Sequence, residues 1–322
     1  LIALNALKNF DITKNLPLKT LFELNDKKNK ININDLGFLI GPILNAGGRL
    51  GKSKYATELL SSSNDQVIKD RSNHLIKLNN KRKDIETLIL SEIDFQKIEK
   101  ENKDIIIYYD PNINEGLIGI IAARLKDYFN KPSIVITVSN DLLKGSARSI
   151  YDYNIGRVIK NSLDKDIILN GGGHNMAAGF TLNKKNLKSF EKYILEDFSK
   201  SKILNDNIFL YESEVSSLAF NQDFYSDIKK LEPFGTGNSV PTFMIKDLII
   251  VKPVILNKKH ISAILKSKTG FSIKSISFNS INTKIGEYLM SYKNNINVIG
   301  QINENIWNNK KTLQLTIRDL IL

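Results

Sequence analysis

Apolar residues in the first hundred positions recur at helical spacing. Gly41-Pro42 is expected to end one of these helices, because proline rarely continues a helix, and residues 45–49 are then expected to form a loop. After Ser63-Asn64-Asp65-Gln66, which has the spacing of a capping box, apolar residues return at steps of three, four and seven as far as Ile93. The pattern therefore predicts a long helix, preceded by short helices at residues 1–7, 18–24 and 34–42.

Between positions 100 and 200, short apolar runs alternate with amphipathic stretches. Apolar runs of this kind predict buried strands, and the alternation is typical of an α/β domain. Gly171-Gly172-Gly173-His174 follows an apolar run and is expected to form a tight connection between two extended segments. We expect strands at residues 105–109, 132–138, 144–150 and 178–182, and helices at residues 117–128, 155–163 and 187–198.

Beyond residue 206 strands predominate. They are predicted at residues 208–215, 242–256, 261–266, 271–278, 296–303 and 312–322, with helices at residues 225–231 and 285–290. About five strands with a helix before the last pair are typical of an OB-type β-barrel. Aromatic side chains lie among basic ones in this part of the chain. Some must be core and others could stack on unpaired bases: Phe243, Phe271, Phe278, Tyr288, Tyr292 and Trp307.

The formal charge of +12 is concentrated toward the end of the chain. Residues 241–322 hold 12 Lys and Arg against 4 Asp and Glu, and 12 − 4 leaves 8 positive charges there. Such clustering favours a nucleic-acid surface, and a solvated lysine-rich surface is the alternative. The chain has no Cys, which excludes disulfides and thiolate metal sites, and no apolar run near the ~20 residues that span a bilayer. We expect a cytoplasmic protein without membrane contact.

The glycine-rich stretch at residues 171–179 is the main candidate for chemistry. Glycines let backbone groups approach a phosphate closely, and Ala177-Ala178-Gly179 keeps the following segment small. His174 is the side chain in this stretch that could take part in chemistry. On the residues alone, a glycine-rich turn with a packed histidine is the alternative interpretation.

Four stretches together resemble one family. Gly172-Gly173-His174 with Ala177-Ala178-Gly179, preceded by Gly145-Ser146-Ala147-Arg148-Ser149, looks like the DHHA1 domain of the DHH phosphoesterases. Residues 41–50 and 232–238 resemble the Gly-Pro-x-x-Asn-Ala-x-Gly-Arg and Glu-Pro-Phe-Gly-x-Gly-Asn segments of the RecJ family. The matches follow that family's order and cover nearly the whole chain. Gly47 is a departure, since the family more often has Ala there.

The resemblance implies a single-stranded-DNA-specific exonuclease that degrades from the 5′ end in DNA repair and recombination. It implies Mn²⁺ or Mg²⁺ as cofactor, single-stranded DNA as partner, and a single-stranded-DNA-binding protein and a helicase as further expected partners. The family's metal-binding set is not found, because there is no Asp-His-His and the three histidines are His74, His174 and His260. We therefore expect a fragment without most of the DHH domain, without a metal site, and inactive alone.

By the same resemblance, four residues are expected to bind the substrate. Ser146 and Arg148 match the positions that the family uses on nucleic-acid phosphates, the terminal 5′ phosphate among them. A guanidinium fork suits phosphate oxygens and a hydroxyl adds a donor, although a solvated strand arginine is the alternative. Asn45 and Arg49 are expected near the boundary with the missing domain.

His174 is the residue expected to be catalytic. The resemblance implies that it faces the scissile phosphate from the opposite wall of the cleft and donates to the charge that develops there. Gly172 and Gly173 are expected to bring the backbone close to that phosphate, and a side chain at either position is expected to be equally harmful. His74, within the long helix, is expected to be a surface residue.

These expectations divide the chain into four parts. They are a remnant of the DHH domain at residues 1–62, a long connecting helix at 63–99, an α/β DHHA1 domain at 100–203 and an OB-type domain at 204–322. One alternative function is a non-catalytic module that grips single-stranded nucleic acid. The other is a DHH-type small-nucleotide phosphodiesterase, and the predicted barrel argues against it, because such enzymes usually end soon after the GGxH module.

Overall fold

The computed structural model describes residues 2–27, 31–201, 209–235, 237–281, 283–307 and 310–322. Contacts divide the chain into two compact units. The sheet unit comprises Phe10–Asn205, and the barrel unit comprises Leu1–Asn9 together with Asp206–Leu322. No helix in the described part of the chain is long and apolar enough to cross a membrane.

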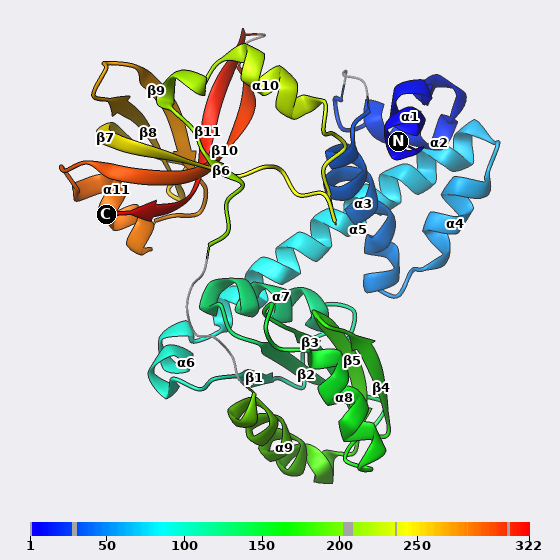
Figure 1. Ribbon diagram of the computed structural model, residues 1–322. Coiled ribbons are helices and arrows are strands. Elements are labelled where there is room, and N and C mark those ends of the chain that lie inside the picture. Colours follow the sequence, from blue (N-terminus) through cyan, green and yellow to red (C-terminus); the bar gives the residue numbers. More distant parts are fainter. Residues whose placement is uncertain (1, 28–30, 202–208, 236, 282, 308–309) are drawn as a thin grey trace. The chain divides into compact units, whose positions relative to one another are not determined.

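The first part of the sheet unit is helical. Its helices bury their apolar faces around Leu21, Ile43, Leu59 and Leu75. This shared burial stabilises helices that are too short to be stable alone. After α1 (Ile2–Asn9), the elements are η1 (Ile12–Lys14), α2 (Leu16–Glu23), η2 (Asp35–Ile40), α3 (Gly41–Arg49), α4 (Lys54–Ser61), α5 (Asp65–Glu92) and α6 (Phe95–Glu101) (Figure 1).

The helix expected to stop at Gly41-Pro42 continues, so this prediction is wrong. The π-helical segment η2 runs directly into α3, and Pro42 lies in the first turn of α3. Proline is tolerated there because the N–H that it lacks has no partner in the first turn of an α-helix. Residues 45–49 consequently lie on a helix and not in a loop.

The predicted long helix is present as α5, with 28 residues. Its N-cap is Asn64, whose Oδ1 accepts a hydrogen bond from the Val67 N–H at 3.1 Å. The helix ends at Glu92 rather than near residue 99. Ile93 is extended, and Asp94 caps the new helix α6 by accepting from the Lys97 N–H at 2.9 Å.

The predicted α/β domain is present as a five-stranded sheet of order β1-β2-β3-β5-β4 (Figure 1). β1 and β2 pair in parallel, and the other neighbours pair antiparallel. Val135 of β2 faces α7, whereas Ile134 and Ile136 face α8 and α9, so helices cover both faces. The elements are β1 (Ile106–Tyr109), α7 (Ile118–Phe129), β2 (Ser133–Ser139), β3 (Leu142–Arg148), α8 (Ile155–Asp164), β4 (Asn170–His174), β5 (Ala177–Leu182), η3 (Lys184–Asn186) and α9 (Leu187–Lys200).

The stretch from Gly171 to His174 is part of strand β4 and not a connection, so this prediction is also wrong. It pairs with β5 up to His174 opposite Ala177, and the turn consists of two residues. The glycines of this strand have no positive φ, so they provide space rather than an unusual backbone. A Cβ on Gly171 would lie 2.8 Å from Ile159 Cγ2, which shows how closely α8 packs on the strand.

The predicted OB-type barrel is confirmed in the barrel unit. Strands follow the order β10-β11-β9-β8-β7-β6, and β7 also pairs with β10, which closes the barrel around Leu248, Leu265, Ile273 and Leu315. The elements are β6 (Ser213–Glu214), η4 (Ser217–Ala219), α10 (Gln222–Lys229), β7 (Phe243–Leu256), β8 (His260–Ser267), β9 (Ser272–Ser277), α11 (Lys284–Ser291), β10 (Ile296–Trp307) and β11 (Lys310–Ile321). β6 is shorter than the predicted strand at 208–215, whose first residue lies outside the described residues.

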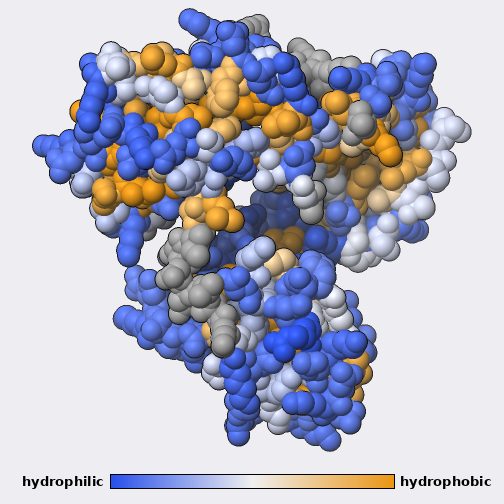
Figure 2. All heavy atoms as spheres, in the orientation of Figure 1, coloured by the Kyte–Doolittle hydropathy of each residue, from blue (hydrophilic) through white to orange (hydrophobic). Residues whose placement is uncertain are grey.

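The aromatic residues of the barrel fall into two groups. Phe243 is buried, and Phe271 and Tyr292 pack against the core. Phe278 and Tyr288 remain 55% and 37% exposed. On the face drawn in Figure 2, apolar patches lie among hydrophilic residues over the barrel. Of the six candidates for base stacking, these two exposed rings have the accessibility that stacking needs, while the side chain of Trp307 lies outside the described part.

The N-cap of α5 is testable by mutation. Asn64→Ala removes the acceptor of the Val67 N–H, and we expect the free energy of unfolding to fall by about 1 kcal/mol. Ser63→Ala is the matched control and should leave stability unchanged. Urea denaturation of the two variants checks this, and an equal or larger loss for Ser63→Ala would contradict the assignment.

Candidate functional site

Ser146 and Arg148 lie two residues apart on β3 and therefore project from the same face of the sheet. Arg148 Nη1 donates to Ser146 Oγ at 3.1 Å and to the carbonyl of Ala147 at 2.8 Å. The first turn of α7 packs on both side chains. A Cβ on Gly119 would lie 2.9 Å from Arg148 Nη2 and 3.1 Å from Ser146 Oγ, so glycine at this position makes room for the guanidinium group.

The register of the sheet brings His174 to the same face. Arg148 and His174 both pair with Ala177, from the strands on either side of β5. Residues paired across neighbouring strands share a face, so the three form one row whose ends are about 10 Å apart at the backbone. On this face α7 packs over β2 and β3, whereas Gly179 of β5 and Gly172 of β4 are exposed. Ala177, Gly179 and Gly172 thus form a floor of small residues, here termed the open platform, between Arg148 and His174.

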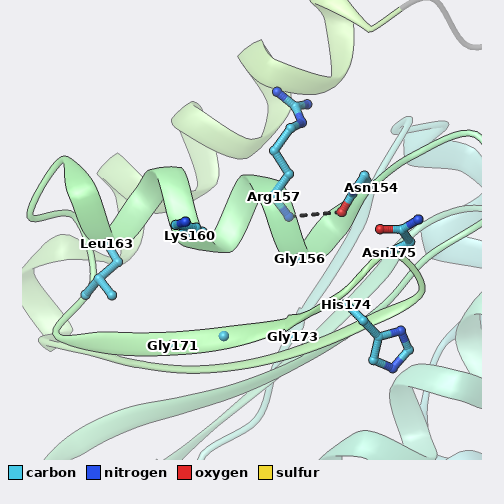
Figure 3. Close-up of a pocket in the computed structure, with 10 residues that line it drawn as sticks. Asn154, Gly156, Arg157, Lys160, Leu163, Gly171, Gly173, His174 and Asn175 are labelled. Atoms are coloured by element: carbon cyan, nitrogen blue, oxygen red, sulfur yellow. Dashed lines mark hydrogen bonds between the residues drawn. The ribbon is translucent and has the colours of Figure 1, made fainter.

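His174 presents one ring nitrogen as a donor. Nδ1 accepts from the Met176 N–H at 3.3 Å, so Nε2 carries the proton of the neutral ring. The side chain is exposed, and its ring points away from α8 (Figure 3). A pocket between α8 and β4 is lined by Arg157 and Lys160 of α8 and by residues 171–174 of β4. The ring therefore lies on the side of β4 that carries the open platform.

The two glycines singled out from the sequence have different surroundings. A Cβ on Gly173 would lie 2.2 Å from the carbonyl of Ala177 and 2.6 Å from Ala178 Cβ. A Cβ on Gly172 would meet nothing within 4 Å. Gly173 is therefore required by the packing of the sheet itself, while Gly172 leaves the open platform accessible. This difference separates two residues that were expected to act alike.

Arg49 and Asn45 lie one turn apart on α3, so they share one side of that helix. Arg49 Nη1 donates to the carbonyl of Gly116 at 3.0 Å, just before α7. A Cβ on Gly116 would lie 2.2 Å from the Arg49 carbonyl, so the end of α3 packs directly on this residue. Asn45 is exposed. The structure thus brings Arg49 to the end of α7 that also packs on Arg148.

Arg49 and Arg148 lie close enough to repel one another. Burial lowers the pKa of Arg148 from its usual value, and the positive charge of Arg49 lowers it further. Burial likewise lowers the pKa of Arg49, followed by the charge of Arg82, while the carboxylate of Glu86 acts in the opposite direction. Both guanidinium groups remain charged at neutral pH. Two partly buried cations held together favour the binding of an anion.

Sequence reasoning missed three residues of this region. Glu86 of α5 is 7% exposed and accepts from Arg82 Nη1 and from Arg124 Nε, each at 2.7 Å. The spacing of Arg82 and Glu86, four residues apart in a predicted helix, was a visible signal for their pairing. Arg124 lies 38 positions beyond Glu86, and no spacing rule connects the two. Its participation follows from how α7 packs on α5.

The stretch from Glu232 to Asn238 folds as a tight turn in the barrel unit. Gly235 and Asn238 exchange backbone hydrogen bonds at 2.8 and 3.0 Å. Asn238 Nδ2 donates to the carbonyls of Leu231 and Pro233 at 2.9 and 3.0 Å. Thr236 lies outside the described residues. The Asn side chain therefore has a structural role, since it satisfies two backbone acceptors of its own turn.

The described residues include no group of three or more His, Asp or Glu side chains that could hold a metal ion. An Asp-x-Asp spacing does occur at Asp164 and Asp166, at the end of α8. Both are exposed and do not belong to such a group. His74 is exposed on α5, where its Nδ1 lies 2.8 Å from the carbonyl of Asp70. The residues that the structure describes thus do not fit a two-metal hydrolytic centre.

Comparison with known protein families gives two matches. The model of the DHHA1 domain matches residues 102–200, and the model of the RecJ OB domain matches residues 211–319. The single-stranded-DNA-specific exonuclease RecJ of Bacillus subtilis is 28% identical over 99% of this chain and 41% of its own length. That of Haemophilus influenzae is 32% identical over 78% of this chain and 46% of its own length. The chain belongs to the RecJ family.

The RecJ fold extends over nearly the whole chain. The crystal structure of RecJ from Thermus thermophilus in complex with Mg²⁺ superimposes with a TM-score of 0.77, at 21% identity, over 96% of this chain and 46% of that one. A crystal structure of the same protein with Mn²⁺ gives the same TM-score. The chain spans less than half the length of these RecJ proteins. The family resemblance of the four sequence motifs and the expected α/β and OB folds are therefore confirmed.

Alanine substitution distinguishes the two glycines of β4. Gly173→Ala should destabilise the protein by roughly 1–3 kcal/mol, because its Cβ would overlap Ala177 and Ala178. Gly172→Ala should change stability by less than about 0.5 kcal/mol, because its Cβ meets no atom. Thermal unfolding of the matched pair checks this expectation. Equal losses of stability would mean that both glycines serve packing.

Proposed function

We propose that this chain is the substrate-binding part of a RecJ-type, single-stranded-DNA-specific exonuclease that acts in DNA repair and recombination. In this proposal the open platform receives the 5′-terminal phosphates of the strand. Ser146, Arg148 and Arg49 bind the terminal phosphate, with Asn45 near them on α3, and His174 faces the phosphodiester that is cleaved. The barrel holds the strand farther from its end.

One observation carries this proposal. Arg148 and His174 stand at the two ends of one cross-strand row, with Ala177 between them. The floor between these side chains is made of small residues, so an extended nucleotide backbone can lie on it without steric hindrance. The guanidinium fork of Arg148 is fixed by Ser146 and by the carbonyl of Ala147, which prepares it for phosphate oxygens.

The chemistry of His174 suits a phosphate whose charge increases during the reaction. Its Nε2–H can donate to a non-bridging oxygen, because Nδ1 is occupied as an acceptor. A donor that is held in place before the reaction stabilises developing charge without reorganisation. Gly172 beside it lets the backbone approach the same phosphate, since no Cβ covers this part of the floor.

The barrel supports a role in holding single strands. Residues 241–322 carry 12 basic and 4 acidic side chains, and OB barrels combine basic grooves with aromatic platforms for unpaired bases. Phe278 and Tyr288 are exposed aromatic residues on this barrel. A single-stranded-DNA-binding protein and a helicase belong to the proposal as partners of the cytoplasmic enzyme, on the strength of the family alone.

Hydrolysis by this route requires divalent metal ions that the described residues do not hold. The proposal therefore assigns the Mn²⁺ or Mg²⁺ ligands to a DHH domain, of which residues 1–62 would form the end. The other assignments are a connecting segment at 63–99, a DHHA1 domain at 100–203 and an OB domain at 204–322. Because the described residues include no metal-binding cluster, a second candidate function for this chain alone is the binding of single-stranded DNA without cleavage.

Binding of matched oligonucleotides tests the phosphate site. The chain should bind a 5′-phosphorylated single strand more tightly than the 5′-hydroxyl strand, and both affinities should fall as salt increases. Arg148→Gln should weaken binding of the phosphorylated strand roughly 10–100-fold and remove the preference. Lys160→Gln, on the α8 side of β4, is the control that loses the same charge and should keep the preference. Fluorescence anisotropy gives the dissociation constants of the three proteins for both strands, and a preference that survives Arg148→Gln would overturn the assignment.

The role of His174 is tested in a longer protein that includes a metal-binding DHH domain. His174→Ala should lower kcat by roughly 10²–10³-fold with little change in KM, because the donor acts on charge that grows in the transition state. Arg148→Ala in the same protein should mainly raise KM, because its contact is already made in the ground state. Steady-state kinetics on 5′-phosphorylated single strands separates the two effects. If His174→Ala keeps the kcat of the parent protein, the assignment of His174 as a catalytic residue is wrong.

A further inference from the structure

Glu86 is a buried carboxylate that joins two helices. It lies in the last two turns of α5 and is 7% exposed. Its Oε2 accepts from Arg82 of the same helix, and its Oε1 accepts from Arg124 of α7, both at 2.7 Å. Arg82 is held further by its Nε, which donates to Asn79 Oδ1 at 3.2 Å. A buried charge of this kind is tolerated because both of its oxygens have cationic partners.

The helix that Glu86 binds is also the helix that shapes the phosphate site. Gly116, just before α7, accepts the hydrogen bond of Arg49. Gly119, in the first turn of α7, packs against Arg148 and Ser146. Any shift of α7 along or around α5 would therefore change the distance between Arg49 and Arg148.

Apolar packing alone does not fix the position of α7. Ile89 of α5 and Ile93 just after it belong to one buried cluster with Leu117, just before α7, and Ile121 of α7. Such contacts are non-directional, so aliphatic side chains can exchange neighbours with little loss when a helix slides or rotates. A carboxylate between two guanidinium groups is directional, because each N–H must point at an oxygen. The side chain of Arg124 is more than half exposed, and its ion pair with Glu86 holds the guanidinium group in place.

We propose that Glu86 is a positioning residue, which fixes α7 on α5 through Arg124, while Arg82 holds the carboxylate in place, and thereby sets the spacing of Arg49 and Arg148 for a terminal phosphate. This inference rests on the proposed function, because it assigns the two arginines to phosphate binding. Glu86 itself does not touch the substrate. It also occupies Arg82 and Arg124, so that Arg49 and Arg148 are the two arginines of the cluster left to meet an anion.

A purely electrostatic role for Glu86 makes a different prediction. The carboxylate acts against the positive charges around Arg49, so Glu86→Gln would raise the local potential and tighten the binding of every phosphate. Arg124→Gln would lower the same potential and weaken binding. If Glu86 acts by positioning, both substitutions break the same bridge and impair the site in the same way.

The experiment compares Glu86→Gln and Arg124→Gln in the full chain. For each variant, anisotropy titrations give the ratio of affinities for 5′-phosphorylated and 5′-hydroxyl single strands of one sequence. We expect this ratio to fall roughly tenfold in both variants, since small displacements of positioning groups have large effects. Changes in opposite directions, or an unchanged ratio in both, would overturn the inference. Arg124 is at the surface, so Arg124→Gln should fold even where Glu86→Gln is destabilised.

Two further measurements make the result specific. Glu58→Gln is the matched control, because the described ion pairs of Glu58 are with Arg71 and Lys54 in the same helical region and not with a residue of α7, and it should leave the ratio unchanged. The NMR signals of the Arg49 and Arg148 Nε–H groups report on positioning without DNA, and they should shift in both bridge variants. If the parent chain has no preference for a 5′ phosphate, the proposed function fails. The NMR measurement needs no DNA, so unshifted arginine signals in both bridge variants would overturn the positioning role whether or not that preference exists.

Discussion

The antiparallel register of β3, β5 and β4 is the constraint on which the site depends. Side chains alternate between the faces of a strand, so a slip of one residue would turn His174 and Arg148 toward α8 and α9 and expose core residues in their place. Several contacts hold the register. The β4–β5 turn has two residues, and the N–H groups of Ser149 and Ile155 donate to the carbonyls of Met176 and Asn175 at 2.9 and 3.2 Å. The turn is thus tied both to the end of β3 and to the start of α8.

The same alternation divides the small residues of β5 between two roles. Ala178 and Phe180 are buried in the core beneath α8 and α9. Ala177 and Gly179 lie on the other face and form the floor between Arg148 and His174. One short stretch therefore contributes both to the core and to the open platform, because adjacent residues face opposite sides of the sheet. A glycine or alanine in such a stretch cannot be assigned to either role until its face is known.

Charge around the site is distributed unevenly. Four arginines from β3, α3, α5 and α7 are linked by contacts or by mutual repulsion, and Glu86 is the carboxylate that the described contacts place among them. Glu86 neutralises part of this charge and orders two of the arginines. Arg49 and Arg148 are left with burial and repulsion that lower their pKa values, so an anion between them would relieve an existing electrostatic cost.

Periodicity and the sequence motifs were enough to indicate the classes of structure in this chain and its resemblance to the RecJ family. Periodicity located α5, the α/β region and the barrel strands, because these patterns reflect which face of each element is buried. Predictions from proline and glycine failed at Pro42 and at Gly171–Gly173. Proline is tolerated in the first turn of a helix, and glycine is tolerated in a strand on which a helix packs closely. The family motifs pointed to Arg148 and His174. Tertiary structure, however, places these two residues in one row, gives Gly172 and Gly173 different surroundings, and forms the bridge from Glu86 to Arg124. Strand register and helix docking join residues far apart in sequence, and no local pattern encodes their distance.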